Sequence, residues 1–86
     1  MAEIFKALSD PGRLQIARLL RSGELCASDI AQILQIDQSS LSHQLKILKF
    51  HDIVISRKDG KYHRYSLNNA CVRELLDLMD KYLVNC

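Results

Sequence analysis

The chain has 86 residues, 48% of them apolar, and a formal net charge of +2 from twelve Lys and Arg against ten Asp and Glu. The length predicts one small domain over residues 1–86, and so mild a charge does not by itself indicate a nucleic-acid partner. No apolar run approaches the length of a membrane span and no basic start precedes an apolar signal core, so we expect a soluble, cytoplasmic protein without a membrane partner.

Two helices are expected in the first part of the chain. Residues 1–8 predict a short helix with three apolar side chains on one side: Ile4, Phe5 and Leu8. In the second helix, Asp10 occupies the N-cap and Pro11 the first helical position, where proline is tolerated. Gly23 follows the apolar stripe of this helix and predicts its end.

A short third helix and a longer fourth helix follow. In "CASDIAQIL", Cys26 precedes Asp29 by three positions, which is the spacing of a capping box, and Ser28 is a competing cap. Asp37 is expected to cap the fourth helix, which extends to about His51. Three leucines of this helix share one face: Leu41, Leu45 and Leu48.

The rest of the chain predicts a β-hairpin and a final helix. Branched and aromatic residues flank Asp59-Gly60, a strong signal for a two-residue turn. The final helix extends from about Asn69 to the end of the chain and keeps one long apolar stripe. The expected fold is therefore mainly α with a β-hairpin: a winged helix-turn-helix with helices one to four, a two-stranded wing and a C-terminal dimerisation helix.

Polar side chains of the fourth helix form a second face that suits DNA reading. In a helix-turn-helix, the second helix enters the major groove and its N-terminal residues reach base edges, whereas lysines further along meet phosphates. The candidate contacts on this helix are Gln38, Ser39, Ser40, Ser42, His43, Gln44 and Lys46. The alternative is an ordinary solvated helix face.

The predicted hairpin is basic. It carries four cationic residues: Arg57, Lys58, Lys61 and Arg64. Asp59 is the one acidic residue in this segment of the sequence. A short basic hairpin beside a polar groove helix suits the DNA backbone or the minor groove. The alternative is an edge hairpin whose lysines discourage aggregation.

Three segments of the sequence stand out: "ALSDPGRLQIARLL", "ELCASDIAQILQIDQSSLSHQLKIL" and "ISRKDGKYHRYSL". They resemble, in this order, the opening of the second helix, the helix-turn-helix and the wing of the ArsR/SmtB family of bacterial winged-helix repressors. The match covers nearly the whole chain. The resemblance implies a homodimer that represses transcription at a double-stranded DNA operator and is released by an inducer. It also implies groove contacts by Gln38, Ser39, Ser42 and His43, and a wing from Arg57 to Arg64.

The chain departs from the metal sites that the resemblance implies. Members with a site at the third helix carry C-x-C, but "ELCASDI" keeps Cys26 and has Ser28 in place of the second cysteine. One thiolate and one hydroxyl make a poor site for As(III) or Cd(II) unless other cysteines join. The last-helix zinc positions of other members correspond here to Asn69, Cys71, Tyr82 and Asn85, so zinc is not expected there.

The cysteines Cys26, Cys71 and Cys86 are candidate sensor residues. The last two are about 22 Å apart along one helix, so they cannot bond within a chain. If two last helices pair antiparallel, Cys71 lies near the partner's Cys86. A disulfide, persulfide bridge or shared soft metal there would change the spacing of the two recognition helices. The alternatives are that Cys71 is a small buried hydrophobe and that Cys26, at a helix N-terminus, is a weak cap rather than a reactive thiol.

The apolar surplus of so small a chain indicates a dimer interface. Its candidate residues on the last helix are Leu75, Leu76, Met79, Tyr82 and Leu83. The alternative is that these residues pack within their own subunit. Two other functions stay open: a winged-helix protein-interaction module, and a ligand-independent repressor with purely structural cysteines. An enzyme is not expected, because the sequence has no glycine-rich phosphate loop and no nucleophile with a base and an acid at recognisable spacing.

Overall fold

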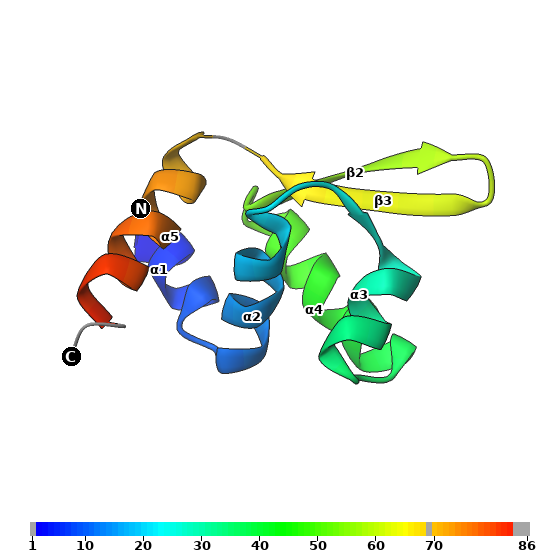
Figure 1. Ribbon diagram of the computed structural model, residues 1–86, viewed down its shortest axis with the longest axis horizontal. Coiled ribbons are helices and arrows are strands. Elements are labelled where there is room, and N and C mark those ends of the chain that lie inside the picture. The colour runs from blue at the N-terminus through cyan, green and yellow to red at the C-terminus, as the bar shows by residue number, and fades with distance from the viewer. Residues whose placement is uncertain (1, 69, 84–86) are drawn as a thin grey trace.

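The computed structural model describes residues 2–68 and 70–83 of the chain. Its elements follow one another in the order α1 (Ala2–Leu8), α2 (Pro11–Leu20), β1 (Leu25–Cys26), α3 (Ala27–Leu34), α4 (Gln38–Phe50), β2 (Val54–Asp59), β3 (Tyr62–Leu67) and α5 (Ala70–Leu83). The predicted winged helix-turn-helix is confirmed. The helix-turn-helix consists of α3 and α4, and β2 and β3 form a wing that extends away from the helices (Figure 1).

The wing belongs to a three-stranded antiparallel sheet, whereas the sequence predicted two strands. The strand order is β1-β3-β2, and β1 pairs with β3 so that Cys26 lies opposite Arg64. With two residues, β1 is too short to show the period-two alternation from which a strand can be read. Its pairing connects the start of α3 directly to the wing.

The turn of the wing lies one residue later than predicted. Asp59 pairs with Tyr62, so the two loop residues are Gly60 and Lys61 rather than Asp59 and Gly60. Gly60 has a φ of 62°. A two-residue loop with glycine as its first residue is typical of a type II′ turn. The predicted Asp59-Gly60 loop is instead typical of a type I′ turn.

The predicted caps of α2 and α4 are confirmed. The Asp10 carboxylate accepts a hydrogen bond from Arg13 N at 3.0 Å, and Pro11 begins α2. The Asp37 carboxylate accepts one from Ser40 N at 3.2 Å. Each bond satisfies an amide that the helix itself leaves without an acceptor.

The capping box predicted for α3 is absent. Cys26, and not Ser28, is the N-cap residue, and its side chain accepts no hydrogen bond from the helix. The thiol instead donates to the Asp29 carboxylate at 3.1 Å, because sulfur is a weak acceptor and the carboxylate a strong one. At the other end of α3, Gln35 adopts the left-handed conformation with φ 56° and ψ 47°, which glycine adopts more easily.

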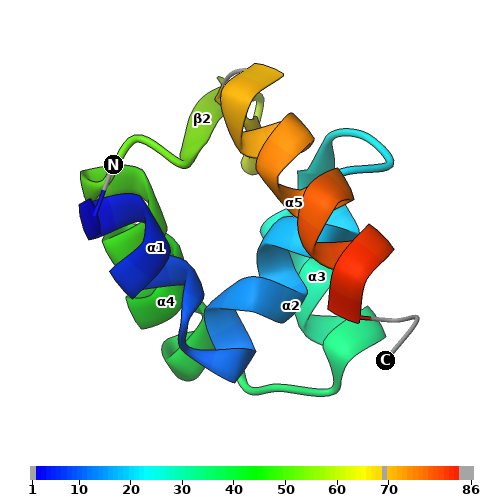
Figure 2. The same ribbon diagram turned by 90° about the vertical axis from the view of Figure 1, so that its left-hand side faces the viewer.

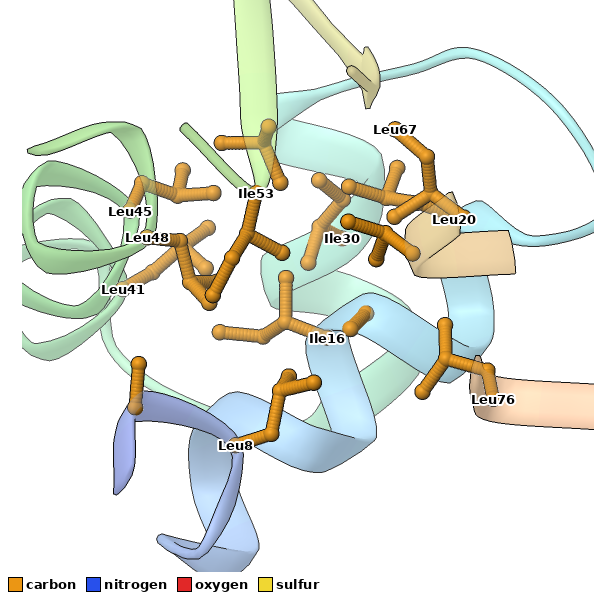
Figure 3. Packing of buried hydrophobic residues seen from close by; sticks show 14 of the residues in the cluster. Leu8, Ile16, Leu20, Ile30, Leu41, Leu45, Leu48, Ile53, Leu67 and Leu76 are labelled. Atoms are coloured by element: carbon orange, nitrogen blue, oxygen red, sulfur yellow. The ribbon is translucent and has the colours of Figure 1, made fainter. Parts of the chain in front are cut away.

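Apolar side chains from all five helices and from the base of the wing pack into one core (Figure 3). The three α4 leucines predicted to share a face, Leu41, Leu45 and Leu48, are buried there beside Ile16 and Ile30. Burial of each such side chain stabilises the fold by about 2–3 kcal/mol. Because α4 is attached along this one face, its opposite face stays at the surface.

Helices α1 and α5 lie at the end of the molecule opposite the tip of the wing (Figures 1 and 2). Ion pairs attach α5 to α2: Asp80 pairs with Arg18 at 2.6 Å and also with Arg21, which in turn reaches Asp77. The orientation of α5 is therefore coupled to the helical core. Over the described ranges, every helix is too short or too polar to cross a membrane.

Candidate nucleic-acid interface

The first turn of α4 is fixed by Asp37. Its carboxylate accepts hydrogen bonds from the Ser39 hydroxyl and from Ser40, and these bonds lower the pKa of the carboxyl from 3.8 to about 2. The side chain is therefore ionised at neutral pH, next to the positive end of the helix dipole. The arrangement sets where α4 begins.

Opposite the buried leucines, α4 presents a polar surface. Six of the predicted contacts are exposed on it: Gln38, Ser39, Ser40, Ser42, His43 and Lys46. Hydroxyls and an amide occupy the first turns, and the ammonium group follows more than two turns after the cap. Short polar groups at one end can reach base edges, while the ammonium group meets a phosphate.

Gln44, also predicted as a contact, is half-buried between α4 and α2. Its Oε1 accepts a hydrogen bond from Arg13 Nη1 at 3.1 Å, and its Nε2 donates to the Asp10 carboxylate at 3.3 Å. Arg13 Nε also donates to the Ala7 carbonyl at 2.7 Å. The amide of Arg13 is the main cause of the lowered pKa of Asp10. Gln44 thus joins α4 to the end of α1 and the start of α2.

The wing borders the polar face of α4. A hollow of about 240 Å³ separates them, with Gln38 and Ser42 of α4 on one side and His63 and Tyr65 of β3 on the other. The two elements also bond directly, because Lys49 Nζ donates to Ser56 Oγ at 2.8 Å. The helix face and this side of the wing therefore border one another across a hollow whose lining also includes Ala27, Leu41 and Leu45.

The wing arginines are paired, which the sequence did not predict. Arg57 binds both carboxylate oxygens of Glu24, at 2.9 and 2.8 Å, and Arg64 Nε donates to Asp59 at 2.9 Å. The hydrogen bond from Arg57 lowers the pKa of Glu24, and the carboxylate in turn raises the pKa of Arg57. Asp59 is the one acidic residue within the hairpin segment, but Glu24, which is distant in sequence, also reaches the wing through the sheet.

An apolar groove lies between α1 and α5. It measures about 300 Å³ and is lined by apolar side chains of both helices, Ile4, Phe5, Cys71, Val72, Leu75 and Leu78, together with Glu74. The side chains of Phe5 and Leu78 are 51% and 52% exposed, whereas Leu8, predicted on the same side of α1, is buried. Half-exposed apolar side chains around a groove are typical of a surface that another protein covers.

The interface predicted from the last helix needs one correction. Leu76 is fully buried in the protomer's own core, so it has no surface left for a partner. Leu75 and Met79 are half-buried, and Leu78, absent from the prediction, is exposed on the groove. The side chains of Tyr82 and Leu83 lie outside the described part of the structure. The long stripe read from the sequence combines a core side and a groove side of the same helix.

The two described cysteines occupy different environments. Cys26 is buried, and its sulfur lies 3.3 Å from the Ser28 hydroxyl and 3.1 Å from Asp29 Oδ2. Cys71 is exposed and lines the apolar groove, so within one protomer it is not the buried hydrophobe that one interpretation expected. Cys86 lies outside the described residues. No group of three or more His, Cys, Asp or Glu side chains within the described ranges is arranged to hold a metal ion.

Comparisons with known proteins bear on this geometry. Residues 10–56 match the family model described as "Bacterial regulatory protein, arsR family". The arsenical resistance operon repressor of Staphylococcus xylosus is 43% identical over 83 residues, which cover 96% of this chain and 76% of that protein. The transcriptional repressor SdpR of Bacillus subtilis is 36% identical, with 96% of this chain and 92% of that protein covered.

A solved structure shows the same arrangement of elements. The homodimeric winged helix-turn-helix DNA-binding domain from Mycobacterium bovis superposes with a TM-score of 0.87 at 32% identity, over 92% of this chain and 73% of that one. The matched family region contains α2, α3, α4 and the start of the wing, and it therefore includes the polar face of α4 described above. The chain belongs to the arsR family of bacterial regulatory proteins, which are DNA-binding transcriptional regulators and not enzymes.

Proposed function

We propose that the protein is a homodimeric transcriptional repressor that binds a double-stranded DNA operator in the cytoplasm. The observation that carries this proposal is the exposed polar face of α4, held outward by its buried leucines and bordered by the wing. Family membership and the names of the relatives support it.

In this proposal, α4 enters the major groove. The base contacts come from the side chains exposed near the N-terminal end of the helix: Gln38, Ser39, Ser40, Ser42 and His43. Lys46 meets a phosphate further along. Gln44 makes no base contact, since both ends of its amide are already bonded to α2.

A second copy of the chain would cover the groove between α1 and α5. The half-exposed Phe5 and Leu78, with Leu75 beside them, then become buried against the partner. A two-fold axis at this end of the molecule leaves both wings and both α4 helices free. Recognition helices about 34 Å apart reach successive major grooves on one side of the duplex.

Fluorescence anisotropy with the DNA upstream of the protein's own coding sequence tests the proposal. Affinity should exceed that for a scrambled duplex and should fall linearly on a log–log plot against salt. Gln38→Ala should weaken specific binding about tenfold per half-site, or about a hundredfold for the dimer, within the range of a lost base contact in each protomer. Gln15→Ala removes an equally exposed glutamine from α2 and is the matched control. Equal affinity for both duplexes would contradict operator recognition.

We also propose that an inducer acts on the thiols, as an oxidant, a persulfide donor or a soft metal such as As(III) or Cd(II). The name of the Staphylococcus xylosus relative supports a soft metal, and the exposure of Cys71 on the groove supports a change in the dimer. A bond from Cys71 to the partner's Cys86 would act at that interface. Cys26 is the second candidate, because a buried thiol at the start of α3 is coupled to the wing through β1.

The same anisotropy assay tests the inducer. Fully reduced protein is compared with samples given oxidant, persulfide, Cd(II), As(III) or Zn(II), and each experiment is repeated with Cys71→Ser and Cys26→Ser. Release that is lost in one of these variants identifies the sensing thiol. Binding that none of the reagents alters would make the cysteines structural and leave a repressor controlled in some other way.

A further inference from the structure

The cations on the two strands of the wing are divided between its faces. Successive side chains of a strand point to opposite faces, and residues directly opposite each other in an antiparallel pair share a face. Lys58 lies opposite His63, and Ser56 opposite Tyr65, on the face that borders α4. Arg57 lies opposite Arg64, on the other face.

On that other face, two carboxylates neutralise the arginines. Arg57 and Arg64 are direct cross-strand neighbours, and like charges in that position destabilise a sheet. Glu24 binds Arg57 through two hydrogen bonds and Asp59 binds Arg64 through one, so the four side chains sum to zero charge. The pair of Glu24 and Arg57 also spans the sheet, from the residue before β1 to the strand β2 at the far edge.

The two lysines are differently placed. Lys58 and Lys61 are exposed, and neither forms an ion pair with a carboxylate among residues 2–68 and 70–83. Lys61 is in the turn at the tip, with its ammonium group 5.5 Å above the Tyr62 ring. A contact of this kind at an exposed site is worth about 0.5–1 kcal/mol, which leaves the ammonium group available to an anion.

We propose that Lys58 and Lys61 make the phosphate contacts of the wing, whereas Glu24, Arg57, Arg64 and Asp59 form a neutral brace that positions it. This assignment rests on the proposed DNA binding and refines it, because only cations that neutralise phosphates displace counterions from DNA. An arginine of the brace would have to leave its carboxylate and turn to the opposite face of the sheet to do so. The brace instead holds the wing at the angle that places Lys58 on the side of the sheet that borders α4 and Lys61 at the tip.

The dependence of duplex affinity on salt tests the assignment. Lys58→Gln and Arg57→Gln are neighbours in sequence, and each removes one charge per protomer. Each lysine variant, Lys58→Gln or Lys61→Gln, should reduce the log–log salt slope by about 0.9 per protomer. Arg57→Gln, and the charge-conserving double variant Glu24→Gln/Arg57→Gln, should keep the slope of the unsubstituted protein. Their lines should be shifted to lower affinity in parallel for every duplex, since a tilted wing weakens all DNA equally.

Circular dichroism establishes that each variant is folded. Two results would overturn the assignment while the proposed function stands. One is that the double variant reduces the salt slope as much as Lys58→Gln does, and the other is that both lysine variants leave the slope unchanged. Failure of the unsubstituted protein to bind any duplex would overturn the proposed function, and this assignment with it.

Discussion

Two leucines of α5, two positions apart, allow the core and the proposed dimer interface to be tested separately. Leu76 has no exposed surface in the protomer, whereas Leu78 is 52% exposed on the groove between α1 and α5. The same truncation to alanine therefore removes core packing at one position and mostly surface at the other.

The magnitudes follow from this burial. Truncation of a fully buried leucine costs about 2–5 kcal/mol of unfolding free energy, because a cavity remains where the side chain packed. The exposed half of Leu78 would contribute about 1 kcal/mol on burial against a partner. A two-fold dimer contains this contact twice, so Leu78→Ala should weaken dimerisation by about 2 kcal/mol, or roughly thirtyfold in the dissociation constant.

Sedimentation equilibrium measures the dimer constant, and urea unfolding at several protein concentrations separates protomer stability from association. We expect Leu76→Ala to lower the unfolding free energy at every concentration. Leu78→Ala should mainly raise the dissociation constant of the dimer and make the unfolding midpoint more dependent on concentration. A dimer constant that Leu78→Ala leaves unchanged, or equal losses of protomer stability in the two variants, would refute this division of α5.

Three further predictions concern the helix-turn-helix. Gln35→Gly should raise the unfolding free energy by about 0.5–1 kcal/mol and the thermal midpoint by about 2–8 °C, because glycine adopts the left-handed conformation without strain; an unchanged or lower midpoint would contradict this. The folded-state pKa of Asp37 is about 2 against an ordinary 3.8. The stability advantage of the wild type over Asp37→Asn in urea unfolding should therefore be complete above about pH 4 and decrease as the pH falls towards 2. Gln44→Ala should cost about 1 kcal/mol of unfolding free energy but leave the ratio of affinities for operator and scrambled duplex unchanged. Substitution of a residue that contacts a base would lower that ratio.

The helices could be predicted from the sequence because their signals are local. Asp10 and Asp37 precede their helices by one residue, and the three leucines of α4 recur at helical spacing within eight residues. Cys26 is the exception: its spacing to Asp29 is that of a capping box, but a thiol is too weak an acceptor to satisfy the helix amides.

Features that depend on contacts between distant residues could not be predicted. Strand β1 exists because two residues pair with β3, forty residues later in the chain. The partner of Arg57 is Glu24, which lies outside the hairpin segment and could not be identified from that segment alone. The apolar stripe of α5 gives no sign that Leu76 faces α2 and the core while Leu78 faces the groove, because that depends on how the helix is rotated against its neighbours.

The sequence predicted which face of α4 is polar, but not which polar residues of that helix are bonded to α2. Exposure of Gln38, Ser42 and His43 agrees with the polar side expected from the period of α4, although their contacts with DNA stay a prediction. Gln44 has the same chemistry but lies at the edge of that face, where the amide meets Arg13 and Asp10 of α2. Residue type and helical period alone cannot separate these two cases, since the difference is set by the packing of α2 against α4.

Methylation interference on the operator tests the central claim most directly, that two α4 helices of a dimer read successive major grooves. Methyl groups at guanine N7 project into the major groove, where α4 would lie. The proposed function predicts two clusters of guanines, about one helical turn apart, whose methylation interferes with binding. This interference should be weaker for Gln38→Ala and unchanged for Gln15→Ala. A single cluster, or specific binding that major-groove methylation leaves unaffected, would contradict it.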